Sequence, residues 1–373
     1  MNQSCLHISF PKVVRTDEDM WRVTASVGSR EIFFESATPL APAREALPSA
    51  FLLPAMSRGM DLRISGTVCP HWLRNVEEVR TLARKWWSYS GGRILHDGEE
   101  DIAPAGGNAL FFGGGVDSFF ALRRERRCLN HLIYVEGYDV TLPDTERLAR
   151  IADSNRAIAQ QCGLELVTIR TNLRGHPDFR IIYWDNTHGG ALAAVGHLLG
   201  NICSTVFIAG GVHISQVIPH GSHPNMDRAW SSNAVRFIHH GTDSTRLDKV
   251  SAIASWPLVH QHLRVCWEHR KSRLNCGDCE KCVRTQLEFL AEGKLETPAT
   301  FPAGSLLPRI DRVPRVPPLC IQYYEELLER INDSDIRRSI QALLARSPIR
   351  GQARRGRYQL ASGILKKLKG QLV

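Results

Sequence analysis

The sequence lacks any apolar run that approaches the roughly 18 residues of a membrane-spanning helix. Its first residues, MNQSCLHISFPKVVR, have no charged segment followed by an apolar core, so we expect no signal peptide and a cytoplasmic protein. Hydrophobic residues make up 43% of the chain and charged residues 23%, which is ordinary for globular proteins and excludes the disordered and fibrous classes. The 373 residues are enough for two domains, or for one large domain with additions.

Acidic residues are missing from the segment 336–373, which holds ten lysines and arginines. Because the whole chain has a formal net charge of +9 and this segment contributes +10, residues 1–335 sum to −1. A near-neutral body without a stripe of basic and aromatic residues makes nucleic acid an unexpected ligand for it. The basic tail is expected either to dock on the body, a protein partner or an acidic surface, or to stay a solvated appendage.

Several signatures of enzymes are also absent. The chain has no HExxH motif, no nucleophile elbow and no Ser-His-Asp arrangement of a hydrolase. Ten cysteines are many for a cytosolic protein, but four of them fall within residues 266–282 and the other six are scattered. This distribution indicates a metal site plus buried thiols rather than a disulfide framework.

The residue pattern predicts an α/β protein in three parts. Residues 1–100 hold short β-prone runs followed by a helical pattern from Trp72 to Trp87, which predicts a small N-terminal α+β module. Residues 105–295 alternate strands with helices at a spacing that predicts a parallel sheet with helices on both faces. Residues 296–373 comprise a proline-rich connector, a predicted helical extension and the basic tail.

The most informative stretch is a glycine-rich turn that follows an apolar strand and opens a helix, Asn108-Ala-Leu-Phe-Phe-Gly-Gly-Gly-Val-Asp-Ser118. Glycines let backbone N–H groups converge on an anion without a Cβ in the way, and the helix N-terminus adds positive potential. The stretch has neither the Gly-Lys-Ser/Thr of a P-loop nor the GxGxxG of dinucleotide-binding proteins. A glycine turn without a ligand is the alternative to a phosphate-binding loop.

The turn resembles the SGGxDS pyrophosphate loop of the N-type ATP pyrophosphatases, and this resemblance implies that it is the phosphate loop of an ATP site. Ser118 can donate its hydroxyl to a phosphate oxygen, and Asp117 can either help to hold Mg²⁺ or fix the loop. The residues expected to bind ATP are Phe112, Gly113, Gly114, Gly115, Val116, Asp117, Ser118 and, after the next strand, Glu136.

The cysteine cluster has the spacing C-x9-C-x2-C-x2-C and consists of Cys266, Cys276, Cys279 and Cys282. Four thiolates at this spacing can close a tetrahedron around Zn²⁺, and Gly277 eases the first tight turn. A closed four-cysteine site leaves no open coordination position, so we expect a structural zinc ion. An iron–sulfur cluster and four unligated thiols are the alternatives.

Together the two motifs resemble the 7-cyano-7-deazaguanine synthases of the queuosine pathway, which belong to the N-type ATP pyrophosphatases with an SGGxDS phosphate loop. The resemblance covers about half of the chain, from Ala105 to Leu290. It implies a Rossmann-like fold of the adenine nucleotide α-hydrolase (HUP) type with zinc on the four cysteines. It also implies that ATP activates a deazaguanine carboxylate as an adenylate, that ammonia then gives an amide, and that a second activation gives a nitrile.

The sequence departs from that family in three places. Gly113 stands where the SGGxDS pattern has its first serine, so one phosphate-binding hydroxyl is missing. A segment from His213 to Trp230 replaces the family's SGYPDCR-type substrate segment, and the first 100 and last 80 residues have no counterpart. The resemblance therefore implies a relative with a different substrate or partner. Some relatives in bacterial defence systems are thought to attach a deazaguanine to a protein, which the extra segments would suit.

Polar residues beyond the third and fourth predicted core strands are candidates for the substrate site, because ligands of open parallel sheets lie beyond the strand carboxyl ends. His223 or Asp227 could orient a nucleophile or assist proton transfer. A loop of solvated polar residues is the alternative. The substrate candidates are Asp185, His188, His220, Ser222, His223, Asp227 and Arg228.

Two cations, Arg246 and Lys249, are three residues apart and so share a helical face. They are candidates for binding the β- and γ-phosphates and stabilising the departing pyrophosphate, and a solvated basic face is the alternative. With Asp117 and Ser118 they make up the predicted catalytic set.

We therefore expect an ATP-dependent enzyme that adenylates a carboxylate, releases pyrophosphate and transfers the acyl group to ammonia or an amine. ATP, Mg²⁺ and Zn²⁺ are the expected cofactors, and a protein acceptor and a second copy of the chain are candidate partners. One alternative is thiolation of tRNA or a small molecule by an enzyme of the same fold, with Cys203 or Cys162 as the candidate sulfur carrier. The other is a non-catalytic nucleotide-binding subunit of a complex, which Gly113 makes conceivable.

Overall fold

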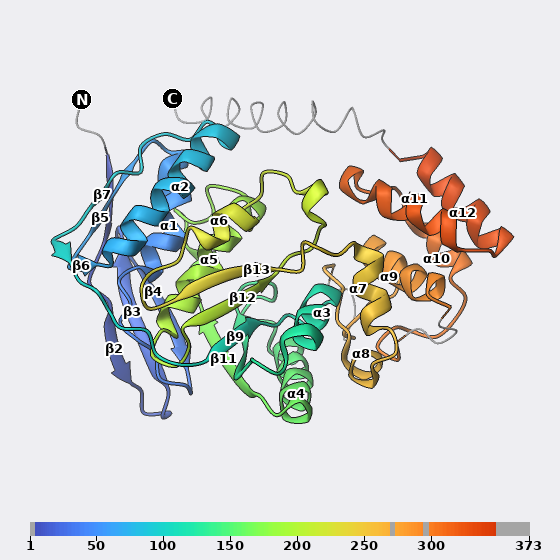
Figure 1. Cartoon of the computed structure of the whole chain (residues 1–373), viewed down its shortest axis with the longest axis horizontal. Helices are drawn as coiled ribbons and strands as arrows, with labels where there is room; N and C mark the ends of the chain where they lie inside the picture. The colour runs from blue at the N-terminus through green and yellow to red at the C-terminus, as the bar shows by residue number, and fades with distance from the viewer. Residues whose placement is uncertain (1–3, 269–272, 294–297, 348–373) are drawn as a thin grey trace. The chain divides into compact units, whose positions relative to one another are not determined.

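A computed structural model describes residues 4–268, 273–293 and 298–347 of the chain (Figure 1). Contacts divide the chain into two compact units, residues 1–249 and 250–373, which are described separately below. No helix within the described ranges is both long and apolar enough to cross a membrane. Residues 348–373, which hold most of the basic tail, lie outside the described residues.

The first unit is built on a mostly parallel sheet, as the strand–helix alternation predicts. Its central strand is β9 (Asn108–Phe111), flanked on one side by β10 (His131–Glu136) and then β11 (Glu165–Thr171). On the other side lie β12 (Thr205–Ala209) and then β13 (Arg236–His240), and all of these neighbours pair in parallel. The chain therefore changes direction across the sheet between β9 and β12, which is the point where ligands of such sheets bind.

Helices cover both faces of this parallel part. Ala109 and Ile133 join one large core with α5 (Trp184–Leu198), whereas the equally buried Leu110 and Leu132 lie outside that cluster because successive strand residues face opposite sides. The helices α3 (Val116–Glu125) and α4 (Thr145–Cys162) contact β9, β10, β11 and β12 on the second face. The arrangement matches the predicted α/β class.

The N-terminal strands extend the same sheet instead of forming a separate module. Antiparallel pairing of Arg170 and Thr171 with Glu35 and Phe34 joins β11 to β4, so eleven strands form one sheet. The division between compact units falls after Lys249, not near residues 100 and 295 as the composition suggested. A lone edge at β11 would expose unpaired backbone groups, and β4 covers it. The added strands are β1 (Cys5–Ile8), β2 (Lys12–Arg15), β3 (Trp21–Val27), β4 (Arg30–Ser36), β5 (Asp61–Ile64) and β7 (Ile94–Leu95).

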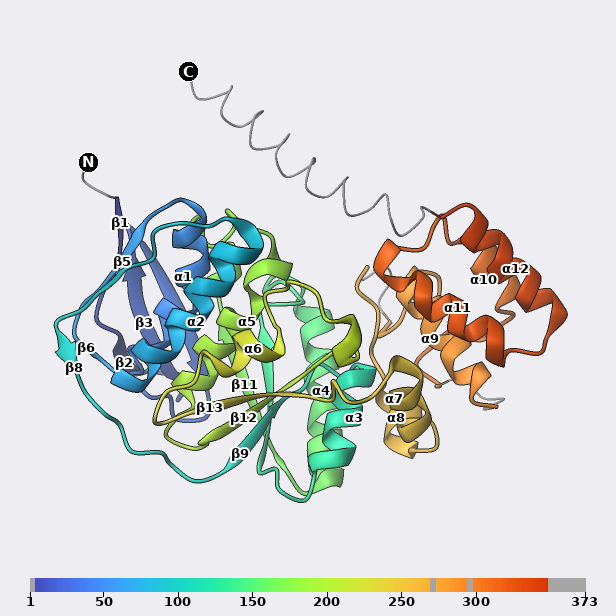
Figure 2. The same cartoon turned by 45° about the horizontal axis from the view of Figure 1, so that its top comes forward.

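Two N-terminal helices pack against the parallel part (Figure 2). The predicted one, α2, runs from Pro70 to Trp87. The other, α1 (Ala46–Ser57), has no predicted counterpart, because its sequence ALPSAFLLPAMS is apolar all round and contains two prolines. All but the last of its 12 residues are buried. A small separate sheet pairs β6 (Thr67–Val68) with β8 (Gly98–Glu99).

The contact between α1 and α5 explains why residue 190 of α5 is a glycine. A Cβ on Gly190 would lie 2.4 Å from the Ser49 carbonyl oxygen, so the two helix backbones touch at this point. The Ala41 amide also donates to the Leu198 carbonyl at the end of α5 (2.8 Å). Residues near the N-terminus thereby help to fix the helix that carries two of the substrate candidates.

The second unit is helical beyond its cysteine-rich loop. Helix α9 (Glu280–Ala291) follows the cysteines, and on it the buried Arg284 bridges Glu280 (2.8 Å) and Glu288 (3.0 Å). Helix α12 (Ser334–Ala345) starts at Asp333, whose side chain accepts from two backbone N–H groups. Together with α11 (Ile321–Arg330), it forms the helical pair that the sequence predicts near the C-terminus. The other helices of this part of the chain are α8 (Pro257–His262) and α10 (Leu307–Arg312), and α7 (Arg246–Ile253) begins in the first unit and ends in the second.

We expect Gly190→Ala to lower the free energy of unfolding by about 1–3 kcal/mol, because the added methyl group forces α1 and α5 apart. Urea denaturation followed by tryptophan fluorescence measures the change. Gly175→Ala is the matched control, since a Cβ there meets nothing within 4 Å. Equal denaturation midpoints for the two variants would show that the helices do not touch as described.

Candidate functional site

The glycine-rich turn lies at the carboxyl end of β9, beside the point where the strand order reverses. The Phe112 amide continues the strand by donating to the Ile133 carbonyl (2.8 Å), and Gly114 then takes a left-handed conformation with φ +73°. The Gly113 amide donates to Ser118 Oγ at 3.3 Å, which draws the start of α3 back over the turn. The sequence therefore folds locally as a phosphate-binding loop requires: strand, glycine turn, helix N-terminus.

Asp117 is the meeting point of the predicted catalytic residues. Its Oδ2 lies 3.2 Å from Arg246 Nη1 and its Oδ1 lies 3.3 Å from Lys249 Nζ. The Lys249 ammonium also donates to the Gly210 carbonyl (2.5 Å) at the end of β12. The structure thus brings Asp117 of α3 together with Arg246 and Lys249 of α7 at the switch point, and Ser118 follows Asp117 in the first turn of α3.

Both cations are buried, so water screens their charges little and their positions are fixed. Lys249 has no exposed surface and Arg246 is 5% exposed. Burial lowers the pKa of Lys249, and the neighbouring Asp117 carboxylate opposes that shift. The ammonium ion is therefore held by its carboxylate partner and by a backbone carbonyl rather than by water.

Glu136 ends the adjacent strand β10 at the same edge of the sheet. It is half-buried, and burial raises the pKa of its carboxyl group, while Arg170, its partner in the β10–β11 register, acts in the opposite direction. The two neighbouring strands thus place an acid and a glycine loop at one edge of the sheet.

A second polar cluster surrounds Asp227, which lies in α6 (Pro224–Arg228) and has no exposed surface. Its Oδ2 accepts a hydrogen bond from Ser222 Oγ (2.6 Å) and one from His239 Nδ1 (2.6 Å). His239, on β13, is the functional candidate that the sequence analysis missed. The signal that could have found it is the short run Arg236–His240, a fifth β-prone segment after the predicted substrate loop.

His188 and His220 face each other beside this cluster, with ring centroids 4.7 Å apart. Burial, reinforced by His220, lowers the pKa of His188 to about 4, so His188 is neutral at pH 7. The Asp185 side chain is exposed. Its backbone carbonyl accepts a hydrogen bond from the Gly221 amide (2.6 Å) and so holds the predicted substrate loop. The predicted residues after the third core strand therefore adjoin those after the fourth.

Two substrate candidates have other roles in the structure. Arg228 is exposed and makes a double hydrogen bond to Glu78 of α2, at 2.7 and 3.0 Å, so it does not join the other candidates. His223 caps α6 by accepting from the Asn225 amide (3.1 Å), and its ring packs on Trp86 of α2 at 4.7 Å. Both contacts show α2 supporting the loop that carries Ser222 and Asp227.

Gly210 and Gly211 lie between two groups of residues: Asp117 with its two cations, and the cluster around Asp227. A Cβ on Gly210 would lie 2.4 Å from His239 Nε2, and a Cβ on Gly211 would lie 4.0 Å from Asp117 Oδ2. Since Lys249 binds the Gly210 carbonyl as well, one short turn after β12 contacts both clusters. The two sets of predicted residues therefore adjoin at the switch point.

The second unit contains the four cysteines of the predicted metal site. The sulfur atoms of its four cysteines all lie within 4.8 Å of one another, and all four side chains are buried. Ligand sulfurs about 2.3 Å from a tetrahedral zinc ion are about 3.8 Å apart. Cys276 Sγ and Cys282 Sγ are 3.9 Å apart, so the group could hold a metal ion such as zinc.

The loop around these cysteines is held from several sides. Gly277 has φ +81°, and a Cβ there would lie 2.5 Å from Pro302 Cγ. The Cys279 amide donates to Cys276 Sγ (3.3 Å), as backbone N–H groups do to ligand thiolates. Hydrogen bonds from Cys276 and the other thiols hold the pKa of Cys266 below its usual value, whereas Cys266 and the others raise the pKa of Cys282. A divalent cation would relieve this crowding of thiols.

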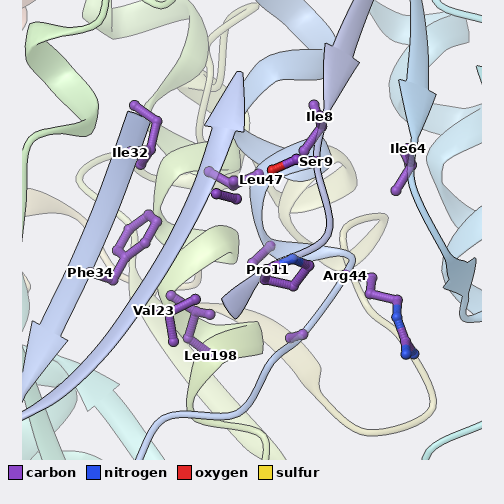
Figure 3. Close-up of a pocket in the computed structure, with 13 residues that line it drawn as sticks. Ile8, Ser9, Pro11, Val23, Ile32, Phe34, Arg44, Leu47, Ile64 and Leu198 are labelled. Atoms are coloured by element: carbon purple, nitrogen blue, oxygen red, sulfur yellow. The ribbon is translucent and has the colours of Figure 1, made fainter. Parts of the chain in front are cut away.

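A small void in the first unit is not part of the site. It lies among the N-terminal strands and α1 and is lined mainly by aliphatic and aromatic side chains such as Val23, Phe34 and Leu47 (Figure 3). Its volume is about 10 Å³, which is close to the smallest space that holds one water molecule. It is too small and too apolar to serve a nucleotide.

No protein-family profile matches this chain, and no similar protein was found among curated proteins or solved structures. The function must therefore be argued from the geometry of the site and from the motifs.

We expect the purified protein to contain about one zinc ion per chain and to be colourless, because four thiolates without an open position suit structural zinc. Cys279→Ser should lose most of this zinc in elemental analysis and lower the melting temperature. Cys128→Ser, at an exposed cysteine, is the control and should keep the metal. Brown protein with iron and acid-labile sulfide would support the iron–sulfur alternative instead.

Proposed function

We propose that this protein is an ATP-dependent enzyme that adenylates a carboxylate, releases pyrophosphate and transfers the acyl group to a nitrogen nucleophile. The observation that carries the proposal is the pair of buried cations, Arg246 and Lys249, held by Asp117 on a glycine loop at the switch point of a parallel sheet. Phosphate groups are the ligands that such a combination of loop amides, helix N-terminus and fixed positive charge suits best.

The proposed reaction begins when a carboxylate oxygen attacks the α-phosphorus of ATP and the bond to the β,γ-pyrophosphate breaks. Negative charge then grows on the leaving pyrophosphate. Lys249 and Arg246 would neutralise it from fixed positions, and the amides of the glycine turn would donate to its oxygens. Ser118, already within hydrogen-bond distance of the Gly113 amide, would add its hydroxyl.

Asp117 suits the orientation of these cations better than the binding of Mg²⁺. Each of its carboxylate oxygens already faces a cation, Arg246 on one side and Lys249 on the other. Of the two roles that the sequence leaves open for Asp117, the geometry favours fixing the loop. A magnesium ion bound to the phosphates would supply further charge neutralisation, and no step of the proposal depends on it.

The resemblance to the 7-cyano-7-deazaguanine synthases suggests the substrate class, a 7-deazaguanine carboxylic acid or a related acid. It also supports the HUP-type assignment of the parallel core, whose strand order along the sheet is β13-β12-β9-β10-β11. In this proposal the zinc-bearing unit is structural. The acceptor is ammonia or an amine, on a small molecule or on a protein, as in a modification or defence system.

The thiolation alternative receives little support from the candidate sulfur carriers. Cys203 is fully buried, and burial raises the pKa of its thiol to about 12. Burial also raises the pKa of Cys162. Neither thiol has the accessible thiolate that sulfur transfer needs.

We expect the wild-type protein to release pyrophosphate from ATP when its carboxylic acid is present, and AMP when ammonia is present as well. A deazaguanine acid and a panel of aromatic and aliphatic acids are the first trial set. Lys249→Met and Ser118→Ala should each lower kcat/KM by about 100-fold or more, because each removes a group that stabilises the leaving pyrophosphate. Lys85→Met, at an exposed lysine on α2, is the control. ATP binding without turnover for every acid would favour the non-catalytic subunit.

Asp117→Asn should change the pH dependence of pyrophosphate release. Burial already lowers the pKa of Lys249, and removing the carboxylate that opposes this shift lowers it further. Lys249 then loses its proton at a lower pH than in the wild type. The alkaline limb of the kcat/KM profile should therefore move to lower pH in the variant. An unchanged alkaline limb would show that Lys249 does not act as a cation in this step.

A further inference from the structure

A buried carboxylate–imidazole pair, Asp227 and His239, adjoins the proposed ATP site. Asp227 is completely buried, and the side chain of His239 is 7% exposed. A distance of 2.6 Å between Asp227 Oδ2 and His239 Nδ1 makes a short, charge-assisted hydrogen bond. Ser222 Oγ donates to the same oxygen, so the carboxylate is held from two directions.

This hydrogen bond sets the tautomer of His239. A carboxylate accepts, so Nδ1 carries the hydrogen and Nε2 presents its lone pair. Among the described residues, no hydrogen bond to His239 Nε2 is found. The imidazole therefore has the form of a general base: one nitrogen is fixed by an acid, and the other is open to accept a proton.

The position of Nε2 ties it to the nucleotide side of the site. It lies 2.4 Å from the point where a Cβ of residue 210 would be, so the ring rests against Gly210 and only glycine fits there. The next residue, Gly211, faces Asp117, and the Gly210 carbonyl binds Lys249. Only the two residues Gly210 and Gly211 therefore lie between His239 Nε2 and the group formed by Lys249 and Asp117.

Several titratable and charged groups surround the His239 ring. His223, whose pKa burial and His239 both lower, and the pair His188–His220 are the nearby titratable groups on α5 and the substrate loop. Beyond the glycine turn the charged groups are Lys249, Arg246 and Asp117. The Asp227 carboxylate is the charged group in direct contact with the ring. Its second oxygen, Oδ1, is buried without a partner among the described residues.

We propose that His239 is the general base of the acyl-transfer step and that Asp227 is its positioning residue; this inference rests on the proposed function. The nitrogen lone pair of the nucleophile forms the C–N bond to the adenylate carbonyl, and one N–H proton passes to His239 Nε2. The bond between the carbonyl carbon and the phosphate oxygen breaks, and its electron pair leaves with AMP. The imidazolium then returns its proton to water.

The experiment separates the two half-reactions with an acid that supports pyrophosphate release in the wild type. Exchange of labelled pyrophosphate into ATP measures adenylation, and amide formation from ammonium chloride measures transfer. We expect His239→Gln to leave exchange within about twofold and to lower amide formation by about 10²–10⁴-fold. Asp227→Asn should reduce transfer in the same direction, because its amide can hold the ring in the wrong tautomer.

Hydroxylamine distinguishes the loss of a general base from structural damage to the transfer site. It is unprotonated at pH 7 and strongly nucleophilic, so hydroxamate formation should be nearly equal in the wild type and in His239→Gln. With ammonium chloride, the rate of His239→Gln should stay below that of the wild type at every pH, because both proteins use the same free-ammonia fraction and only the wild type has the base. His7→Gln, at an exposed histidine on β1, is the control variant.

The ratio of transfer to exchange within each variant does not depend on the folded fraction, so a partly unfolded variant still gives an answer. Normal exchange together with wild-type amide formation in His239→Gln would overturn the role of His239 and leave the proposed function standing. Exchange that falls together with transfer would also overturn it. Absence of exchange in the wild type with every acid would instead contradict the proposed function itself.

Discussion

The buried ammonium group of Lys249 is the constraint around which the first unit is arranged. It cannot stay charged without partners, and it finds two of them on different strands: the Asp117 carboxylate after β9 and the Gly210 carbonyl after β12. These two strands flank the point where the sheet reverses its order. One side chain thus joins the glycine loop, the turn after β12 and the first turn of α7. Positive charge is held where an anionic ligand would enter, and its position is decided by the fold rather than by the ligand.

The N-terminal residues belong to the same construction. They close the edge of the sheet through β4, brace α5 through α1, and hold the substrate loop through Trp86 and Glu78 of α2. Gly190 of α5 packs on the Ser49 backbone of α1, and α5 carries His188 beside the Asp227 cluster. The chain before residue 100 therefore shapes the site although none of its residues was a candidate for it. This also accounts for a single large unit where the composition suggested two domains.

The parts of the site that could be predicted from the sequence are those that local sequence encodes. Three glycines between a strand and a helix, and four cysteines at fixed spacing, carry their geometry with them, and the structure places both as local folding demands. The pairing of β4 with β11 joins residues more than a hundred positions apart, and no local pattern marks it. Helix α1 was missed because its two prolines and unbroken apolar sequence resemble a turn-rich strand region. His239 was missed because only its hydrogen bond to Asp227, twelve residues away on another element, marks it as a candidate.

Gly210 is the residue at which the two halves of the proposed chemistry meet. Its carbonyl anchors the cation that would neutralise pyrophosphate, and its missing side chain makes room for the imidazole that would accept the proton of the nucleophile. Any larger residue would push His239 away from the turn, and the ring could then not lie against the backbone that Lys249 binds. The same short turn would therefore serve adenylation on one side and acyl transfer on the other. In that arrangement the adenylate need not move far between its formation and its attack, because the groups for both steps are fixed to one piece of backbone.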